Sequence, residues 1–125
     1  MSAILWQRIE GALAFGLAAV AAVLLDLPGL MGGSVVLCAV VALAPDASFL
    51  AYLAGPRVGA ACYNLVHLYA WGMILVVLGL GLPAAPLLGM GLLWMGHAGL
   101  DRAIGYGLKE PTAFSDTHLG RVGRR

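Results

Sequence analysis

Three ionisable side chains stand inside otherwise apolar stretches of this sequence: His67, His97 and Asp101. Ionisable groups are rare in such stretches and usually serve a function. Asn64 precedes His67 by three residues, and His97 precedes Asp101 by four, so each pair shares one face if its segment is helical. The spacing therefore predicts one polar face on each of two helices.

Three further side chains give this set the ligand chemistry of a metal site. Asp46 follows an apolar run, whereas Asp116 and His118 lie in a polar C-terminal segment that is close enough along the chain to fold back. Imidazole and carboxylate groups bind zinc and other divalent metals. A bound metal activates water for hydrolysis, with a spare carboxylate as base. The candidate metal ligands are His67, His97, Asp101, Asp46, Asp116 and His118, and the candidate pocket residues are Asn64, His67, His97 and Asp101.

Ordinary structural roles account for the same residues. Asp101 can pair with a cation at a membrane boundary, and with His97 it can form a hydrogen-bonded packing pair. Asn64 and His67 can bridge helices, and Asp116 is a typical turn former or helix cap. The sequence contains no H-E-x-x-H, G-x-S-x-G or P-loop signature, so enzymatic activity stays an open question.

The elements that must position these residues follow from the composition. The chain has 125 residues, of which 62% are hydrophobic and 10% are charged, and its mean hydropathy is +0.95. A soluble domain carries roughly 45–50% apolar and 25% charged residues, and so short a chain has no interior large enough for the excess. The composition excludes an ordinary soluble enzyme and a nucleic-acid-binding protein, and it predicts a lipid bilayer as the surroundings.

Four apolar segments, separated by turn-forming residues, predict an all-α integral membrane bundle of four transmembrane helices. The second segment is short for a hydrocarbon core about 30 Å thick, and residues 47–54 after it are expected to form an interfacial turn of helix. The whole chain is interpreted as a single transmembrane domain with a short polar cytoplasmic tail. The predicted spans cover residues 9–25, 30–44, 57–80 and 87–108, and the tail covers 109–125.

The polar groups of the third and fourth spans fall at matching depths. At a rise of about 1.5 Å per residue, Asn64 and His67 lie roughly 10 and 15 Å from the first residue of the third span. His97 and Asp101 lie roughly 16 and 10 Å from the last residue of the fourth span by the same measure. A short loop joins these spans, so they are expected to pack as antiparallel neighbours. The two polar faces therefore predict a common pocket in the cytoplasmic half of the bilayer.

The basic residues predict the orientation in the membrane. With four spans, the N-terminus, the loop between the second and third spans and the C-terminus share one side. The positive-inside rule then places both termini in the cytoplasm, as in a multi-pass protein of the inner (cell) membrane. All Lys and Arg residues fall on that side: Arg8, Arg57, Arg102, Lys109, Arg121, Arg124 and Arg125.

Five short runs of the sequence form a recognisable set: AGPRVGA at 54–60, YNLVH at 63–67, HAGLDR at 97–102, GYGLK at 105–109 and DTHLGR at 116–121. Together they resemble a family of small bacterial membrane proteins that is catalogued as domain of unknown function 4260. The resemblance covers nearly the whole chain and departs at Glu110, where an aromatic residue is expected before Pro111. It implies a compact four-span protein and no established activity, so it assigns no catalytic residue or cofactor.

Three functions remain open at this point. The first is a membrane protein whose cytoplasm-facing pocket binds a polar ligand or a divalent metal such as zinc, with metal-assisted hydrolysis as its activity. The second is a non-enzymatic accessory subunit of a larger membrane complex. The third is a small transporter or channel that works as a homo-oligomer, with the His and Asp side chains as a proton relay. The apolar run from Ile74 to Leu78 argues against the third, because it offers no continuous polar path.

Overall fold

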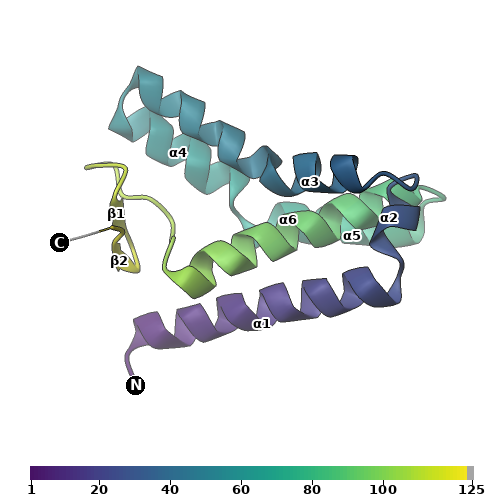
Figure 1. Ribbon diagram of the computed structural model, residues 1–125. Helices are drawn as coiled ribbons and strands as arrows, with labels where there is room; N and C mark the ends of the chain where they lie inside the picture. Colours follow the sequence, from purple (N-terminus) through teal and green to yellow (C-terminus); the bar gives the residue numbers. More distant parts are fainter. Residues whose placement is uncertain (124–125) are drawn as a thin grey trace.

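The computed structural model describes residues 1–123, which form a mostly helical bundle (Figure 1). Two short strands, β1 (Asp116–Thr117) and β2 (Gly120–Arg121), pair in antiparallel fashion after the last helix. Arg124 and Arg125, which enter the predicted charge distribution, lie outside the described residues. The helices are α1 (Ala3–Leu24), α2 (Leu27–Leu30), α3 (Val35–Leu43), the 3-10 helix η1 (Ala44–Ala54), α4 (Pro56–Val66), α5 (Tyr69–Gly81) and α6 (Ala85–Ile104).

The surface of the helices is largely apolar, which fits a membrane protein. Large apolar side chains are widely exposed, as at Leu17, Val23 and Leu53, and contiguous apolar surface of this kind marks contact with a membrane or a partner. Helix α6 has 20 residues but carries charged groups, so the fourth crossing stays a prediction. The segments long and apolar enough to cross a membrane are Ala3–Leu24, Val35–Ala54 and Pro56–Gly81.

Helix α6 is the central helix of the bundle, with α1, α3 and α5 packed against it (Figure 1). Glycines make two of these contacts close. A Cβ atom on Gly99 would lie 2.7 Å from the backbone nitrogen of Phe15 in α1, and one on Gly91 would lie 2.7 Å from the carbonyl oxygen of Gly72 in α5. Small residues let membrane helices approach backbone to backbone. The glycines therefore hold α6, and the side chains it carries, in a defined position.

The second apolar segment is organised differently from the predicted span at 30–44. Helix α3 begins at Val35. Ser34 caps it, because the Ser34 hydroxyl accepts a hydrogen bond from the Leu37 N–H. Although Pro45 is expected to end the helix, the chain continues through η1 to Ala54. A proline in the first turn of a helix loses no internal hydrogen bond, because that N–H has no partner there. Pro45 thus lies in the first turn of a tighter helix, and Asp46 lies in the same turn.

The third apolar segment, predicted as one span at 57–80, is divided at His67 and Leu68. The Leu68 backbone is extended, with φ −72° and ψ 136°, so α4 ends at Val66 and α5 begins at Tyr69. Such a break frees carbonyl groups that a continuous helix would satisfy. Three side-chain N–H groups bond to them: Trp71 to the Leu65 oxygen at 2.7 Å, Trp94 to the Val66 oxygen at 2.9 Å, and Arg102 to the His67 oxygen at 3.5 Å.

The chain returns repeatedly to the same two ends of the molecule. The N-terminus, the turn between η1 and α4, and the paired strands lie at one end in Figure 1. Helix α2 and the loop between α5 and α6 lie at the other. Which end faces which side of a membrane stays a prediction.

Candidate metal centre

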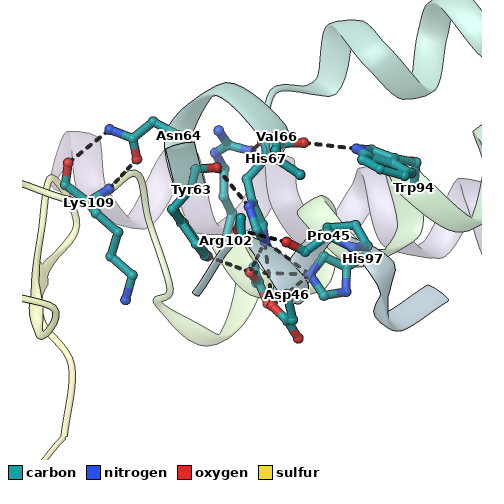
Figure 2. Close-up of polar contacts among 12 residues, drawn as sticks. Pro45, Asp46, Tyr63, Asn64, Val66, His67, Trp94, His97, Arg102 and Lys109 are labelled. Atoms are coloured by element: carbon teal, nitrogen blue, oxygen red, sulfur yellow. Dashed lines mark hydrogen bonds and ion pairs between the residues drawn. The ribbon is translucent and has the colours of Figure 1, made fainter. Parts of the chain in front are cut away.

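Four side chains from three elements converge beside the helix break. Asp46 comes from the first turn of η1, His67 follows the last residue of α4, and His97 and Asp101 lie on α6. Each contributes one nitrogen or oxygen atom to a group in which all four atoms lie within 4.8 Å of one another. Figure 2 shows the side chains of Asp46, His67 and His97 directed toward a common point. We call these four residues the His/Asp cluster.

The separations in the His/Asp cluster resemble the edges of a small coordination tetrahedron. The His67 and His97 Nε2 atoms are 3.2 Å apart. Asp46 Oδ1 lies 3.6 Å from His67 Nε2 and 3.3 Å from His97 Nε2, and Asp101 Oδ2 lies 3.6 and 3.7 Å from the same two nitrogens. Zinc bonds of about 2.0–2.1 Å place tetrahedral ligands about 3.3–3.4 Å apart. Five of the six separations between the four atoms are thus close to those of a tetrahedral zinc site.

The backbone of α4 orients the His67 ring for metal binding. His67 Nδ1 lies 2.8 Å from the carbonyl oxygen of Tyr63. A carbonyl oxygen only accepts, so Nδ1 donates, and Nε2 of the neutral ring presents its lone pair to the other three ligand atoms. Metal-ligating histidines usually make this kind of outer hydrogen bond. This hydrogen bond satisfies the buried Nδ1–H group and leaves Nε2 free to ligate a metal.

The Tyr63 side chain orients two members of the cluster at once. Its hydroxyl donates to Asp101 Oδ2 at 2.7 Å, and its ring stacks on the His67 imidazole with the ring centroids 3.6 Å apart. Tyr63 is only 1% exposed. The sequence interpretation missed this residue, because a tyrosine in an apolar segment resembles a packing residue. Its position four residues before His67 is the signal that could have indicated it.

The four side chains of the cluster differ in solvent exposure, from buried on one side to accessible on the other. The exposed fraction of the side chain is 3% for His67, 10% for His97, 19% for Asp101 and 36% for Asp46. The two carboxylates line an opening together with Phe49, Ile104 and Tyr106. The opening gives a polar molecule access on the carboxylate side, and Asp46 is the member of the cluster most accessible to water.

Asn64, a candidate pocket residue, forms its hydrogen bonds with the tail instead of with the His/Asp cluster. Its side-chain oxygen accepts from the Lys109 N–H at 2.6 Å, and its NH₂ group donates to the Lys109 carbonyl at 2.9 Å. Figure 2 shows this double hydrogen bond on the side of Tyr63 away from His97. Asn64 therefore ties the chain after α6 to α4.

The structure does not bring Asp116 and His118, the other two candidate ligands, to the cluster. Asp116 accepts from the Thr112 hydroxyl at 2.8 Å and pairs with Arg121 at 3.7 Å. His118 Nδ1 accepts from the Leu108 N–H at 2.8 Å. Both side chains thus stabilise the turns of the tail, because the tail closes on itself through its two short strands.

Lys109 is a buried cation that the sequence interpretation did not single out. Its ammonium group donates to the Phe114 carbonyl at 2.9 Å and lies 4.1 Å from the centre of the Phe114 ring, with the Tyr63 and Tyr106 rings also close. Burial lowers the pKa of Lys109, although the Asp101 and Asp46 carboxylates oppose this shift. Cation–π contacts of this kind hold the beginning of the tail in place.

The fold is a helical bundle whose apolar helices are compatible with a membrane protein, with a His/Asp set between them. Residues 4–122 match the family described as a domain of unknown function (DUF4260), and the chain therefore belongs to that family. The match confirms the family predicted from the five short runs, and it includes the whole cluster and most of the tail. Neither the curated proteins nor the solved structures contain a match to the chain.

Proposed function

We propose that this protein binds one divalent metal ion, with the size and ligand preference of zinc, in the His/Asp cluster. The observation that carries the proposal is the spacing of the four ligand atoms, in which the two Nε2 atoms are 3.2 Å apart. The His67 Nδ1 hydrogen bond supports it, because it turns the free lone pair of that ring into the cluster. Imidazole and carboxylate ligands suit zinc, and they also suit manganese and iron.

Metal-assisted hydrolysis is the reaction that these ligands support best. His67, His97 and Asp101 act as a three-residue ligand set, which is the usual number in catalytic zinc sites. A metal held by these residues would lower the pKa of a bound water to about 7. Asp46, at the open side of the cluster, would be placed to accept a proton from such a water as general base. Tyr63 keeps Asp101 in its ligating orientation through the hydroxyl hydrogen bond.

We place the cluster in the cytoplasmic half of the cell's inner membrane, within a single transmembrane domain of four crossings that includes α6. The positive-inside rule supports this orientation, because the N-terminus, the turn before α4 and the tail share one end of the molecule. Five of the seven basic residues lie in the described chain near that end: Arg8, Arg57, Arg102, Lys109 and Arg121.

The break between α4 and α5 favours a second candidate, a cation or proton transporter. Discontinuous helices that meet a polar site within the bilayer are common in ion-coupled transporters. Such a protein would need a second copy of the chain to complete its path, because α5 beyond the break is apolar. Metal or proton flux into proteoliposomes above that of empty vesicles would favour this candidate over hydrolysis. The accessory-subunit interpretation rests on composition alone.

Metal content is the decisive test of the proposal. We expect the full-length chain, purified in mild detergent without chelator and loaded with zinc, to hold about one ion per chain after desalting. His97→Ala and Asp101→Asn should each lower this content at least tenfold while the far-ultraviolet circular dichroism stays unchanged. His118→Ala is the matched control, because His118 lies outside the cluster, and it should keep the metal. Equal zinc content in all four proteins would contradict the proposal.

A further inference from the structure

An apolar groove borders the His/Asp cluster at His97. The groove lies between α1, α3 and α6 and has a volume of about 240 Å³. Among the side chains that line it, only His97 is polar. Ala19 and Leu43 on its rim are exposed, so the groove opens onto the apolar surface of two candidate membrane spans.

Small residues create this groove. Ala18 and Ala42 face it from α1 and α3, and Gly96 faces it from α6. A Cβ atom on Gly96 would meet only the Ala18 Cβ, at an ordinary contact distance of 3.7 Å. At Gly99, by contrast, a Cβ atom would lie 2.7 Å from the backbone of α1. Gly96 therefore leaves space that the packing of the helices does not require.

His97 belongs to the groove and to the cluster at the same time. Its ring lines the groove, and its Nε2 atom lies 3.3 Å from Asp46 Oδ1. On the other side, Asp46 and Asp101 line the polar opening. The cluster thus lies between an apolar compartment that opens toward lipid and a polar compartment that admits water. A molecule that fills both must have a hydrocarbon part and a polar part.

We propose that the groove holds the hydrocarbon chain of a single-chain lipid whose polar head group reaches the metal at His97. This inference rests on the proposed metal centre and names the class of molecule that the centre acts on. The groove faces the hydrocarbon of the bilayer, so a lipid enters it laterally whereas a sugar or a soluble peptide does not. Its volume of about 240 Å³ between alanine, leucine and phenylalanine side chains suits one unbranched chain better than a bulky ring system.

Metal-binding probes that differ only in chain length test this inference. Acetohydroxamate and octanohydroxamate share one head group that ligates metals, and the visible absorption of the cobalt-loaded full-length protein reports their binding. We expect octanohydroxamate to bind at least tenfold more tightly than acetohydroxamate, because burial of each added methylene is favourable. Equal affinity for the two probes would overturn the inference.

A matched pair of variants on α3 distinguishes binding of the probe's chain in the groove from its partition into the detergent micelle. Ala42→Leu fills the groove, whereas Ala39→Leu adds the same side chain at an exposed position of α3 outside it. The chain-length preference should fall below threefold in Ala42→Leu and persist in Ala39→Leu, with acetohydroxamate affinity unchanged in both. Ala22→Leu, with Ala12→Leu as its control, makes the same test from α1 if Ala42→Leu fails to fold.

The outcomes distinguish the two proposals. Failure of the wild-type protein to bind cobalt would contradict the metal centre and, with it, the lipid. Cobalt binding with the same chain-length preference in Ala42→Leu and Ala39→Leu would leave the metal centre standing and overturn the groove alone.

Discussion

Two regions of this molecule are held together by different physical means. Where α6 meets α1 and α5, glycines bring backbones into contact, and the packing depends on shape. Between α4 and the tail, hydrogen bonds between side chain and backbone join segments that shape alone would not align, as between Asn64 and Lys109. Helix α6 belongs to both regions, so the rigid contacts position one side of the cluster and the polar contacts position the other.

The two regions should therefore be destabilised by different kinds of substitution. A contact made by glycine tolerates no added volume, because nothing around it can move aside without separating the helices. A contact made by hydrogen bonds tolerates added volume better than the loss of a donor or acceptor, since a buried group left unpaired keeps its desolvation cost.

The largest effect is expected from added volume at the contact between α5 and α6. A Cβ atom on Gly91 would lie 2.6 Å from the backbone nitrogen of Val76. Gly91→Val should therefore lower the free energy of unfolding by about 3 kcal/mol, measured by thermal unfolding in detergent. Gly16→Val is the control, because Gly16 in α1 has open space around it. Equal unfolding midpoints for the two variants would show that the glycine contact is not tight.

A smaller effect is expected from loss of the double hydrogen bond that holds the tail. Asn64→Ala leaves the Lys109 N–H and carbonyl without their partners, at a cost of about 1–3 kcal/mol. We expect faster tryptic cleavage after Lys109 and faster exchange of its amide hydrogen, with the zinc content unchanged. Asn64→Asp keeps the acceptor and should fall between Asn64→Ala and the wild type. A loss of zinc as large as that in His97→Ala would instead assign Asn64 to the metal centre.

The smallest effect is expected from the buried ammonium group of the tail. Because burial lowers the pKa of Lys109 from its ordinary 10.5, the unfolded chain binds more protons than the folded one between the lowered pKa and 10.5. The stability of the wild type should therefore rise with pH in that window, relative to Lys109→Met, and the difference should be constant below it. Unfolding midpoints of both proteins from neutral pH to about 10.5 check this sign. Parallel curves would mean that the ammonium group is effectively hydrated.

Helical periodicity accounts for what could be predicted of the candidate site. Spacings of three and four residues place Asn64 and His67 on one face and His97 and Asp101 on another, whatever else the fold does. The partners of these residues depend on distant parts of the chain. Asn64 lies on the expected face, yet its partner is Lys109, because the tail returns to α4 by a path that no periodicity encodes.

The helix break shows where sequence reasoning ends. No proline or glycine stands at His67 or Leu68, and the break is stabilised by N–H groups from residues that include Trp94 and Arg102 on another helix. Such tertiary contacts override the local preference of the chain. Asp46, by contrast, is a candidate ligand in the sequence, and the structure places it in the cluster, on the first turn of η1.

The carbonyl groups freed at the helix break also limit how this chain can vary. Within an apolar bilayer a carbonyl without a donor is costly, so the residues at positions 94 and 102 must each supply a long N–H donor to a backbone oxygen about 30 residues earlier in the chain. Phenylalanine can replace the bulk of Trp94, and methionine the length of Arg102, but neither restores the hydrogen bond. The carbonyl groups at the break therefore restrict which residues can replace Trp94 and Arg102. Packing within α6 alone would allow more replacements.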